Sequence, residues 1–144
     1  MDPMVMEGFK PLVICSVVLA FNMMFLSGFT GAMRGKTGTP AIPEDARMVK
    51  GEVKDVVPVE LQRVLNAHRN ALENIPTFMA LSIMYVLTGA SATMVWALMG
   101  TFALARWSHS FCYIKGLQPW RSASYGVGTL AMAIMMVNLV IRVL

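Results

Sequence analysis

Polar and ionisable side chains recur in this chain at spacings that place them together on helices. Asn66, Asn70 and Glu73 follow i, i+4, i+7, and Arg69 lies four residues before Glu73. Because residues at these spacings share one side of a helix, an amide, a guanidinium and a carboxylate are presented together. A single carboxylate compensates one cation, so arginines from other segments would leave a positive excess that attracts an anion. The chemistry predicted here is recognition of a small polyanion.

Two further segments carry polar side chains at helical spacing. In one, four side chains follow i, i+3, i+4, i+7, namely Arg106, His109, Ser110 and Tyr113. In the other, a guanidinium, a hydroxyl and a phenol stand at the start of the last apolar segment, namely Arg121, Ser122 and Tyr125. The free N–H groups and the dipole of a helix N-terminus also favour anions. Three polar faces at one level indicate a shared site more than they indicate packing.

Several polar residues of this chain also have a purely structural interpretation. Arginines at helix ends, such as Arg34, often extend to lipid headgroups as topology anchors. Arg69 and Glu73 could form a structural ion pair, His109 could be a histidine satisfied within the core, and Tyr113 could belong to an interfacial aromatic belt. These alternatives stay open at the level of sequence.

The composition indicates that the elements carrying these residues are surrounded by lipid. The chain has 144 residues, of which 56% are hydrophobic and 14% charged, whereas soluble domains carry about 25% charged residues. Its mean hydropathy is +0.60. Four spans of ~20 residues would use nearly all of this length, so we expect one domain over residues 1–144. The basic residues do not gather on a soluble face, so nucleic acid is not an expected partner, and no metal site is expected.

Apolar runs divide the chain into four predicted helices. Their expected ranges are 11–33, 59–89, 92–114 and 121–144, and a polar segment, 34–58, forms the long loop. Short connections make consecutive helices antiparallel neighbours. The predicted fold is therefore all-α, a bundle of four transmembrane helices. Basic residues concentrate on the long loop and on the link before the last helix, so the positive-inside rule places the site near the cytoplasmic face and both termini on the opposite side.

Four segments resemble motifs of the MAPEG superfamily, the membrane-associated proteins of eicosanoid and glutathione metabolism. They are RVLNAHRNALENIPTF, RWSHSFCYIKGL, QPWRSASY and the loop sequence IPEDA, and the likeness to the microsomal glutathione transferase and prostaglandin E synthase branch covers nearly the whole chain. The resemblance implies a homotrimer with glutathione bound between subunits. The residues that it implies as glutathione contacts are Arg34, Arg69, Asn70, Glu73, His109, Tyr113, Arg121, Ser122 and Tyr125. Asn66 stands where prostaglandin E synthase-like members tend to carry an arginine, and its role stays open.

The resemblance, together with the polar residues that match it, implies a membrane-bound, glutathione-dependent transferase that conjugates or reduces lipophilic electrophiles drawn from the bilayer. Arg121 would hold the glutathione sulfur as a thiolate, with Ser122 donating a hydrogen bond. Asp45 is a candidate proton acceptor if the reaction is an endoperoxide isomerisation. The first alternative is therefore a prostaglandin E synthase-like isomerase or peroxidase. A non-catalytic lipid-binding adapter and a small drug–proton exchanger are alternatives of other classes. The natural electrophile stays open.

Overall fold

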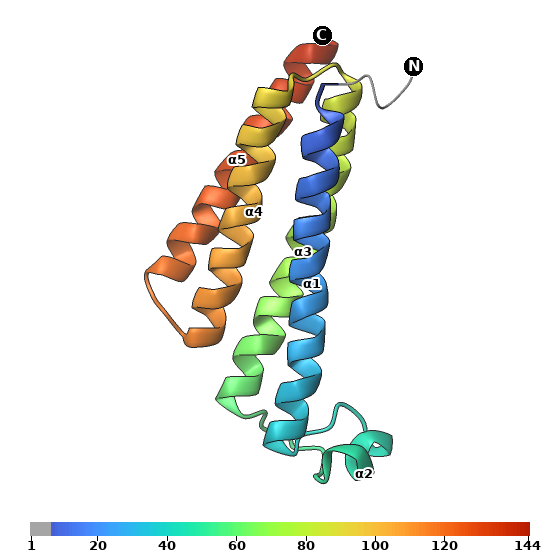
Figure 1. Cartoon of the computed structure of the whole chain (residues 1–144). Helices are drawn as coiled ribbons and strands as arrows, with labels where there is room; N and C mark the ends of the chain where they lie inside the picture. Colours follow the sequence, from blue (N-terminus) through green and yellow to red (C-terminus); the bar gives the residue numbers. More distant parts are fainter. Residues whose placement is uncertain (1–6) are drawn as a thin grey trace.

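The computed structural model describes residues 7–144, so that the first six residues of the predicted domain lie outside the described part (Figure 1). All regular elements of the described residues are helical, as predicted. In chain order they are α1 (Phe9–Thr37), η2 (Pro43–Asp45), α2 (Ala46–Val49), α3 (Val59–Leu87), α4 (Ala92–Lys115) and α5 (Trp120–Val143). The four long helices match the four predicted ranges to within a few residues at each end.

The long helices pack side by side in alternating directions (Figure 1). The start of α1, the α3–α4 link and the end of α5 lie at one end of the bundle, and the long loop and the α4–α5 link lie toward the other. At that second end α1 and α3 extend past the α4–α5 link. The glycines Gly38, Gly89 and Gly116 follow α1, α3 and α4 at positive φ, which ends each helix in a conformation that favours glycine.

Two of the long helices, α1 and α5, are long and apolar enough to cross a membrane. Their most apolar windows have mean hydropathies of 2.2 and 1.8, respectively. Among the described residues these are the two helices that pass this test. In contrast, α3 and α4 carry polar residues along the half that lies toward the long loop. The expected count of four spans therefore stays a prediction, which requires these polar residues to face a protein interior.

The core lies between the apolar halves of the long helices. Leu19 of α1, Ile75 of α3, Val95 of α4 and Met135 of α5 are fully buried there. In lipid, helices gain little from hydrophobic burial against one another, so close packing supplies the attraction. The rings of Phe78 and Phe102 stack with their centroids 3.7 Å apart.

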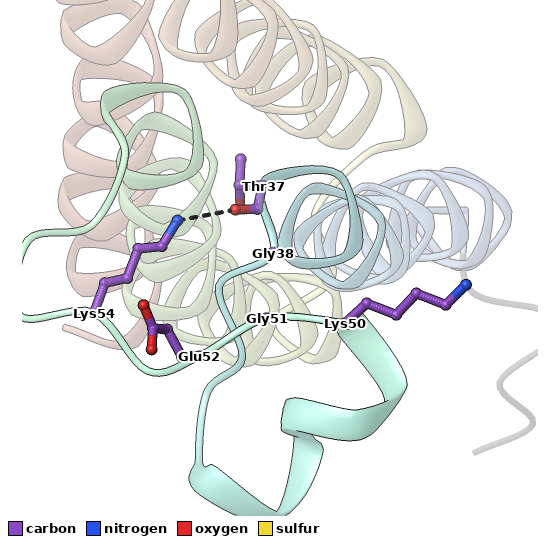
Figure 2. Close-up of a pocket in the computed structure, with 6 residues that line it drawn as sticks. All are labelled: Thr37, Gly38, Lys50, Gly51, Glu52 and Lys54. Carbon is purple, nitrogen blue, oxygen red and sulfur yellow. Dashed lines mark hydrogen bonds between the residues drawn. The ribbon is translucent and has the colours of Figure 1, made fainter.

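The long loop contains two short helices, η2 and α2, that were not predicted. It returns to the end of α1, where a Cβ on Gly51 would overlap the Gly38 carbonyl, so the two backbones are in direct contact. Lys54 Nζ also donates to the Thr37 carbonyl across 3.3 Å (Figure 2). A polar pocket of about 560 Å³ lies among these residues, and Figure 2 shows that Lys50 points away from it. The loop is thus attached to α1 rather than to α4 or α5.

Candidate active site

A buried arginine stands at the centre of the polar half of the bundle. Arg106 of α4 is 2% exposed, and its Nη1 donates to Asn70 Oδ1 of α3 across 3.0 Å. Its guanidinium carbon lies 5.3 Å from the ring centroids of both Phe102 and Tyr125. A Cβ on Gly128 of α5 would come within 2.9 Å of Arg106 Nη2, so the absence of a side chain there makes room for the cation. Within residues 7–144 no carboxylate is paired with Arg106.

Two buried nitrogen atoms in this region have no hydrogen-bond partner among the described residues. One is Nε of Arg106 itself, and the other is Nε2 of His109. His109 is 5% exposed, and its Nδ1 lies 3.0 Å from the Arg121 carbonyl oxygen. Because a carbonyl only accepts, Nδ1 carries the proton in this bond, and Nε2 is left to face another group. Buried polar atoms without partners are costly, so their presence indicates a place for a polar ligand.

A polar cavity of about 270 Å³ lies against two residues that contact this pair, Asn70 next to Arg106 and Tyr113 next to His109. It is lined by Asn66, Arg69, Asn70, Glu73 and Tyr113. The four α3 residues are those whose spacing predicted a shared face, and the structure does bring them to one cavity. Arg69 and Glu73 do not pair with each other, since the ion pair found in the described part of the chain joins Lys36 and Glu60, 3.9 Å apart at the surface. The interpretation of Arg69 and Glu73 as a structural ion pair is therefore not supported.

The first turn of α5 connects to this cavity through aromatic rings. The guanidinium carbon of Arg121 lies 4.6 Å from the centroid of the Tyr113 ring. The His109 ring meets Tyr113 edge-on with centroids 5.5 Å apart, and the Tyr125 ring lies 5.7 Å from it. Seven of the predicted site residues are thus connected within one protomer, namely Arg69, Asn70, Glu73, His109, Tyr113, Arg121 and Tyr125.

Three predicted site residues do not contact this cluster within the described protomer. Ser122 is exposed, and its hydroxyl donates to Gln118 Oε1 across 3.2 Å. Arg34 donates from Nη1 to the Thr39 carbonyl, 3.3 Å away, at the end of α1. Asp45 is half-buried at the end of η2 in the long loop. In this conformation the side chains of these three residues are therefore outside the cluster.

Two features of the site were not assigned from the sequence. Arg106 was placed on a polar face but not among the site residues, although it is the most deeply buried cation of the cluster. Ser110 was placed on that same face, but its hydroxyl lies 3.2 Å from Nδ2 and 3.3 Å from Oδ1 of Asn22 in α1. Two features of the sequence could have indicated these contacts. They are Asn22, the single Asn in the uncharged run of α1, and Gly128 of α5, which leaves room for Arg106.

The cluster can hold an anionic ligand with several polar groups. Arg69, Arg106 and Arg121 supply positive charge, and Glu73 offers an acceptor for an ammonium group. Arg106 is buried and Arg121 is half-buried beside aromatic rings, which strengthens charge-assisted hydrogen bonds at these two groups, whereas Arg69 and Glu73 are exposed. Such a set of groups suits a ligand that carries several carboxylates and one ammonium group.

Comparison with known proteins agrees with this arrangement. The chain matches the model of the MAPEG family over residues 12–141, a range that includes every residue of the cluster. It is 31% identical to the prostaglandin E synthase of Homo sapiens, over 85% of this chain and 81% of the relative. It is 36% identical to the microsomal glutathione S-transferase 1 of Rattus norvegicus, over 82% of this chain and 81% of the relative. The chain therefore belongs to the MAPEG family.

Proposed function

We propose that this protein is a membrane-bound, glutathione-dependent transferase that conjugates or reduces lipophilic electrophiles. The observation that carries the proposal is the buried Arg106, which has no paired carboxylate in the described residues. It contacts Asn70, a residue of the polar cavity, and the nearby His109, whose Nε2 has no partner among the described residues, contacts Tyr113 of the same cavity. The names of two relatives, a prostaglandin E synthase and a glutathione S-transferase, support the choice of ligand.

Glutathione fits the donors and acceptors of this cavity. Arg69 and Arg106 suit its carboxylates, because guanidinium groups form charge-assisted hydrogen bonds with them. Glu73, the acidic residue that lines the cavity, suits its ammonium group. Asn70 can bind the peptide and Arg106 together, since its Oδ1 already accepts from Arg106 while its amide nitrogen can donate. Tyr113 and Tyr125 offer ring faces and hydroxyl groups to the remainder of the tripeptide.

Residues of the cluster have distinct roles in the proposed chemistry, in which bound glutathione supplies the sulfur nucleophile. Arg121 would stabilise that sulfur as a thiolate, and Ser122 would donate a second hydrogen bond after turning from Gln118. A free thiol has a pKa of ~8.5, and lowering it by about two units requires ~2.7 kcal/mol of preferential stabilisation. A hydrogen bond to a charged group contributes about 1.5–3 kcal/mol, so Arg121 and Ser122 together suffice without a general base.

The proposed active unit is a homotrimer of four-span protomers. The cavity of about 270 Å³ lies just below the ~300–1,000 Å³ of typical small-molecule sites, as expected if a neighbour adds a wall. Gly28, Gly31 and Gly35 follow i, i+3, i+7 along α1, and a Cβ at any of them would meet nothing within 4 Å. Small residues on a membrane helix allow another helix to approach closely. Such contact would bring Arg34 from one subunit to the site of the next, and the electrophile would enter from lipid between α1 and a neighbour's α5.

The proposed orientation places the site at the cytoplasmic face. The long loop and the α4–α5 link lie toward the same end of the bundle (Figure 1), and they carry Arg47, Lys50, Lys54 and Lys115. The described residues of the opposite end carry Lys10 and Arg142. An excess of Lys and Arg marks the cytoplasmic side of a membrane protein, so the termini would lie on the other side.

A prostaglandin E synthase-like isomerase, with or without peroxidase activity, is the second candidate. The 31% identity to the prostaglandin E synthase of Homo sapiens favours it. In this reaction Asp45 would accept a proton, which requires its loop to meet a site on another subunit, because it does not reach the cluster of its own protomer. Product analysis with a prostaglandin endoperoxide and with a chlorodinitrobenzene separates the two activities.

Rapid mixing of the purified protein with glutathione tests the proposal. We expect the ultraviolet absorbance of a thiolate to rise at neutral pH, and to be lost in Arg121→Leu while glutathione still binds. The matched variant Arg142→Leu, at the far end of α5, should retain the signal. Glutathione binding without a thiolate signal would contradict the proposed catalysis and favour a lipid-binding adapter, and absence of binding would contradict the site itself.

A further inference from the structure

An apolar groove with aromatic walls runs between α1 and α4. It has a volume of about 240 Å³, and its walls include Phe25 and Phe29 of α1 and Trp107, Phe111 and Ile114 of α4. The Phe25 and Phe29 rings stack with centroids 5.7 Å apart, and the Trp107 ring lies 5.7 Å from Phe25. Phe25 is exposed, and Phe29 and Trp107 are half-buried. A contiguous apolar surface of this kind is suited to a partner or a lipid.

This groove is separate from the candidate active site. The groove residues of α4 follow i, i+4, i+7 from Trp107, whereas the site residues follow i, i+3, i+7 from Arg106. An offset of one residue turns a side chain by about 100° around a helix, so the two sets face different directions. The Ser110 hydroxyl also lines the groove, but it is engaged by Asn22 and by the Arg106 carbonyl. The groove wall is therefore apolar in character.

The wall of the groove is held in place by a contact within the chain. Trp107 Nε1 donates to the Val18 carbonyl across 3.2 Å, which fixes the indole against α1. Phe25 and Phe111 remain exposed on either side of it. A preformed wall reduces the ordering cost of binding, because the side chains that contact the guest are already in place.

Size and charge indicate the guest. A volume of about 240 Å³ is below the ~300–1,000 Å³ of sites for drug-sized molecules, and it suits a length of acyl chain. Of the described residues that line the groove, Lys115 is the charged one, and it is exposed at the last turn of α4, next to the α4–α5 link. A lysine at the membrane surface attracts anionic headgroups. The bulky rings do not permit the close backbone approach that small residues give to a packed helix.

We propose that this groove binds one acyl chain of an anionic phospholipid, with its headgroup at Lys115. The inference rests on the proposed insertion of the helices in a bilayer, and it is independent of the proposed glutathione chemistry. The chain would lie along Phe25, Trp107 and Ile114, and the phosphate would interact with the lysine ammonium.

Fluorescence quenching of Trp107 tests the proposal. The variant Trp96→Phe/Trp120→Phe leaves Trp107 as its single tryptophan, and it is reconstituted in vesicles of phosphatidylcholine. Phosphatidylglycerol or phosphatidylcholine with brominated acyl chains is then added at increasing mole fraction. We expect quenching by both lipids, with about fivefold tighter apparent binding of the anionic one, as for a single surface lysine. Equal binding of the two lipids, or no quenching, as when a second copy covers the groove, would overturn the proposal.

Three substitutions in this background sharpen the result. Lys115→Gln should abolish the preference while quenching persists, and the matched Lys10→Gln, at the opposite end of α1, should leave the preference unchanged. Ile114→Phe should fill the groove and reduce quenching by both lipids. A preference that survives Lys115→Gln, or that Lys10→Gln also removes, contradicts the role of Lys115. Glutathione turnover measured in the same vesicles reports separately on the candidate active site.

Discussion

The two halves of the α3–α4 pair differ in what they bury, apolar side chains in one half and a charged side chain in the other. Toward the α3–α4 link, Phe78 and Phe102 stack face to face, and their neighbours are apolar and fully buried. Toward the long loop, Arg106 is equally buried but has one side-chain hydrogen bond, to Asn70, and Asn70 in turn lines a polar cavity. Close packing in the first half stabilises the bundle, whereas the second half contains a buried charge that costs free energy in a membrane. Along the same two helices, close packing is thus found in one half and the proposed binding site in the other.

The largest expected effect is in the apolar half. Phe78→Ala should lower the free energy of unfolding by about 3–5 kcal/mol, because it removes a fully buried ring and leaves a cavity against Phe102. The measurement is unfolding in mixed micelles with increasing dodecyl sulfate. Ile83→Ala, an exposed position of the same helix, should change stability far less. Equal losses for the two variants would show that packing around Phe78 does not hold the bundle together.

In the polar half, a comparable effect should appear in turnover rather than in stability. Arg121→Leu should reduce turnover of a chlorodinitrobenzene about 10²–10³-fold, the usual result of removing one donor to a developing or stabilised anion. Arg142→Leu serves as the control and should retain turnover per mole of folded protein. If Arg121→Leu turns over at the rate of the parent, the assignment of the thiolate-stabilising role is incorrect.

Substitution of the buried Arg106 tests directly whether the polar half contributes to binding more than to stability. Arg106→Met should weaken glutathione binding by at least ~10-fold, because a charged hydrogen bond is lost. The free energy of unfolding without glutathione should fall by less than ~1 kcal/mol, since the substitution also removes a buried, uncompensated charge. Asn70→Leu should instead lower stability by about 1–3 kcal/mol by leaving that charge without its acceptor. Calorimetry measures glutathione binding, and unfolding in dodecyl sulfate measures stability. Similar destabilisation by the two variants would contradict the interpretation of Arg106 as a buried charge that depends on Asn70.

The smallest expected effect concerns the bond that joins α1 to the polar half. Asn22→Leu should remove the hydrogen bonds to Ser110 at a cost of about 0.6 kcal/mol, a typical value for interhelical bonds in membranes. A double-mutant cycle with Ser110→Ala isolates this term. A coupling energy near zero would show that the hydrogen bonds between Asn22 and Ser110 do not stabilise the bundle.

The helices of this fold could be predicted from sequence because each apolar run is long and is ended by a glycine or a polar link. The range 92–114 was expected for α4, which is observed over Ala92–Lys115 and is followed by Gly116 at positive φ. The short helices η2 and α2 in the loop were missed because each is about a single turn, which is too short for a periodic pattern. Their positions depend on the contact between Gly38 and Gly51, two residues far apart in the loop.

The α3 part of the site was also predictable, since Asn66, Asn70 and Glu73 lie on one helix and their spacing fixes their relation. The central role of Arg106 was not predictable in the same way. It depends on how α4 packs against both α3 and α5, which places Asn70 and Gly128 on either side of the guanidinium. The role of Ser110 depended similarly on the approach of α1, because the partner of its hydroxyl, Asn22, lies far away in the sequence.

Arg121 contacts two residues of the cluster through different groups. Its carbonyl receives the proton of His109 Nδ1, and its guanidinium lies over the ring of Tyr113. Any amino acid other than proline at this position keeps the carbonyl in the first turn of α5, so point substitutions alter the charge and leave the imidazole tautomer as it is. Lengthening or shortening the preceding connection, Gly116 to Pro119, would move the carbonyl itself. Under the proposed role of Arg121, replacing this one side chain would therefore change the reactivity of the bound sulfur, whereas changing the length of the connection would also disturb the histidine.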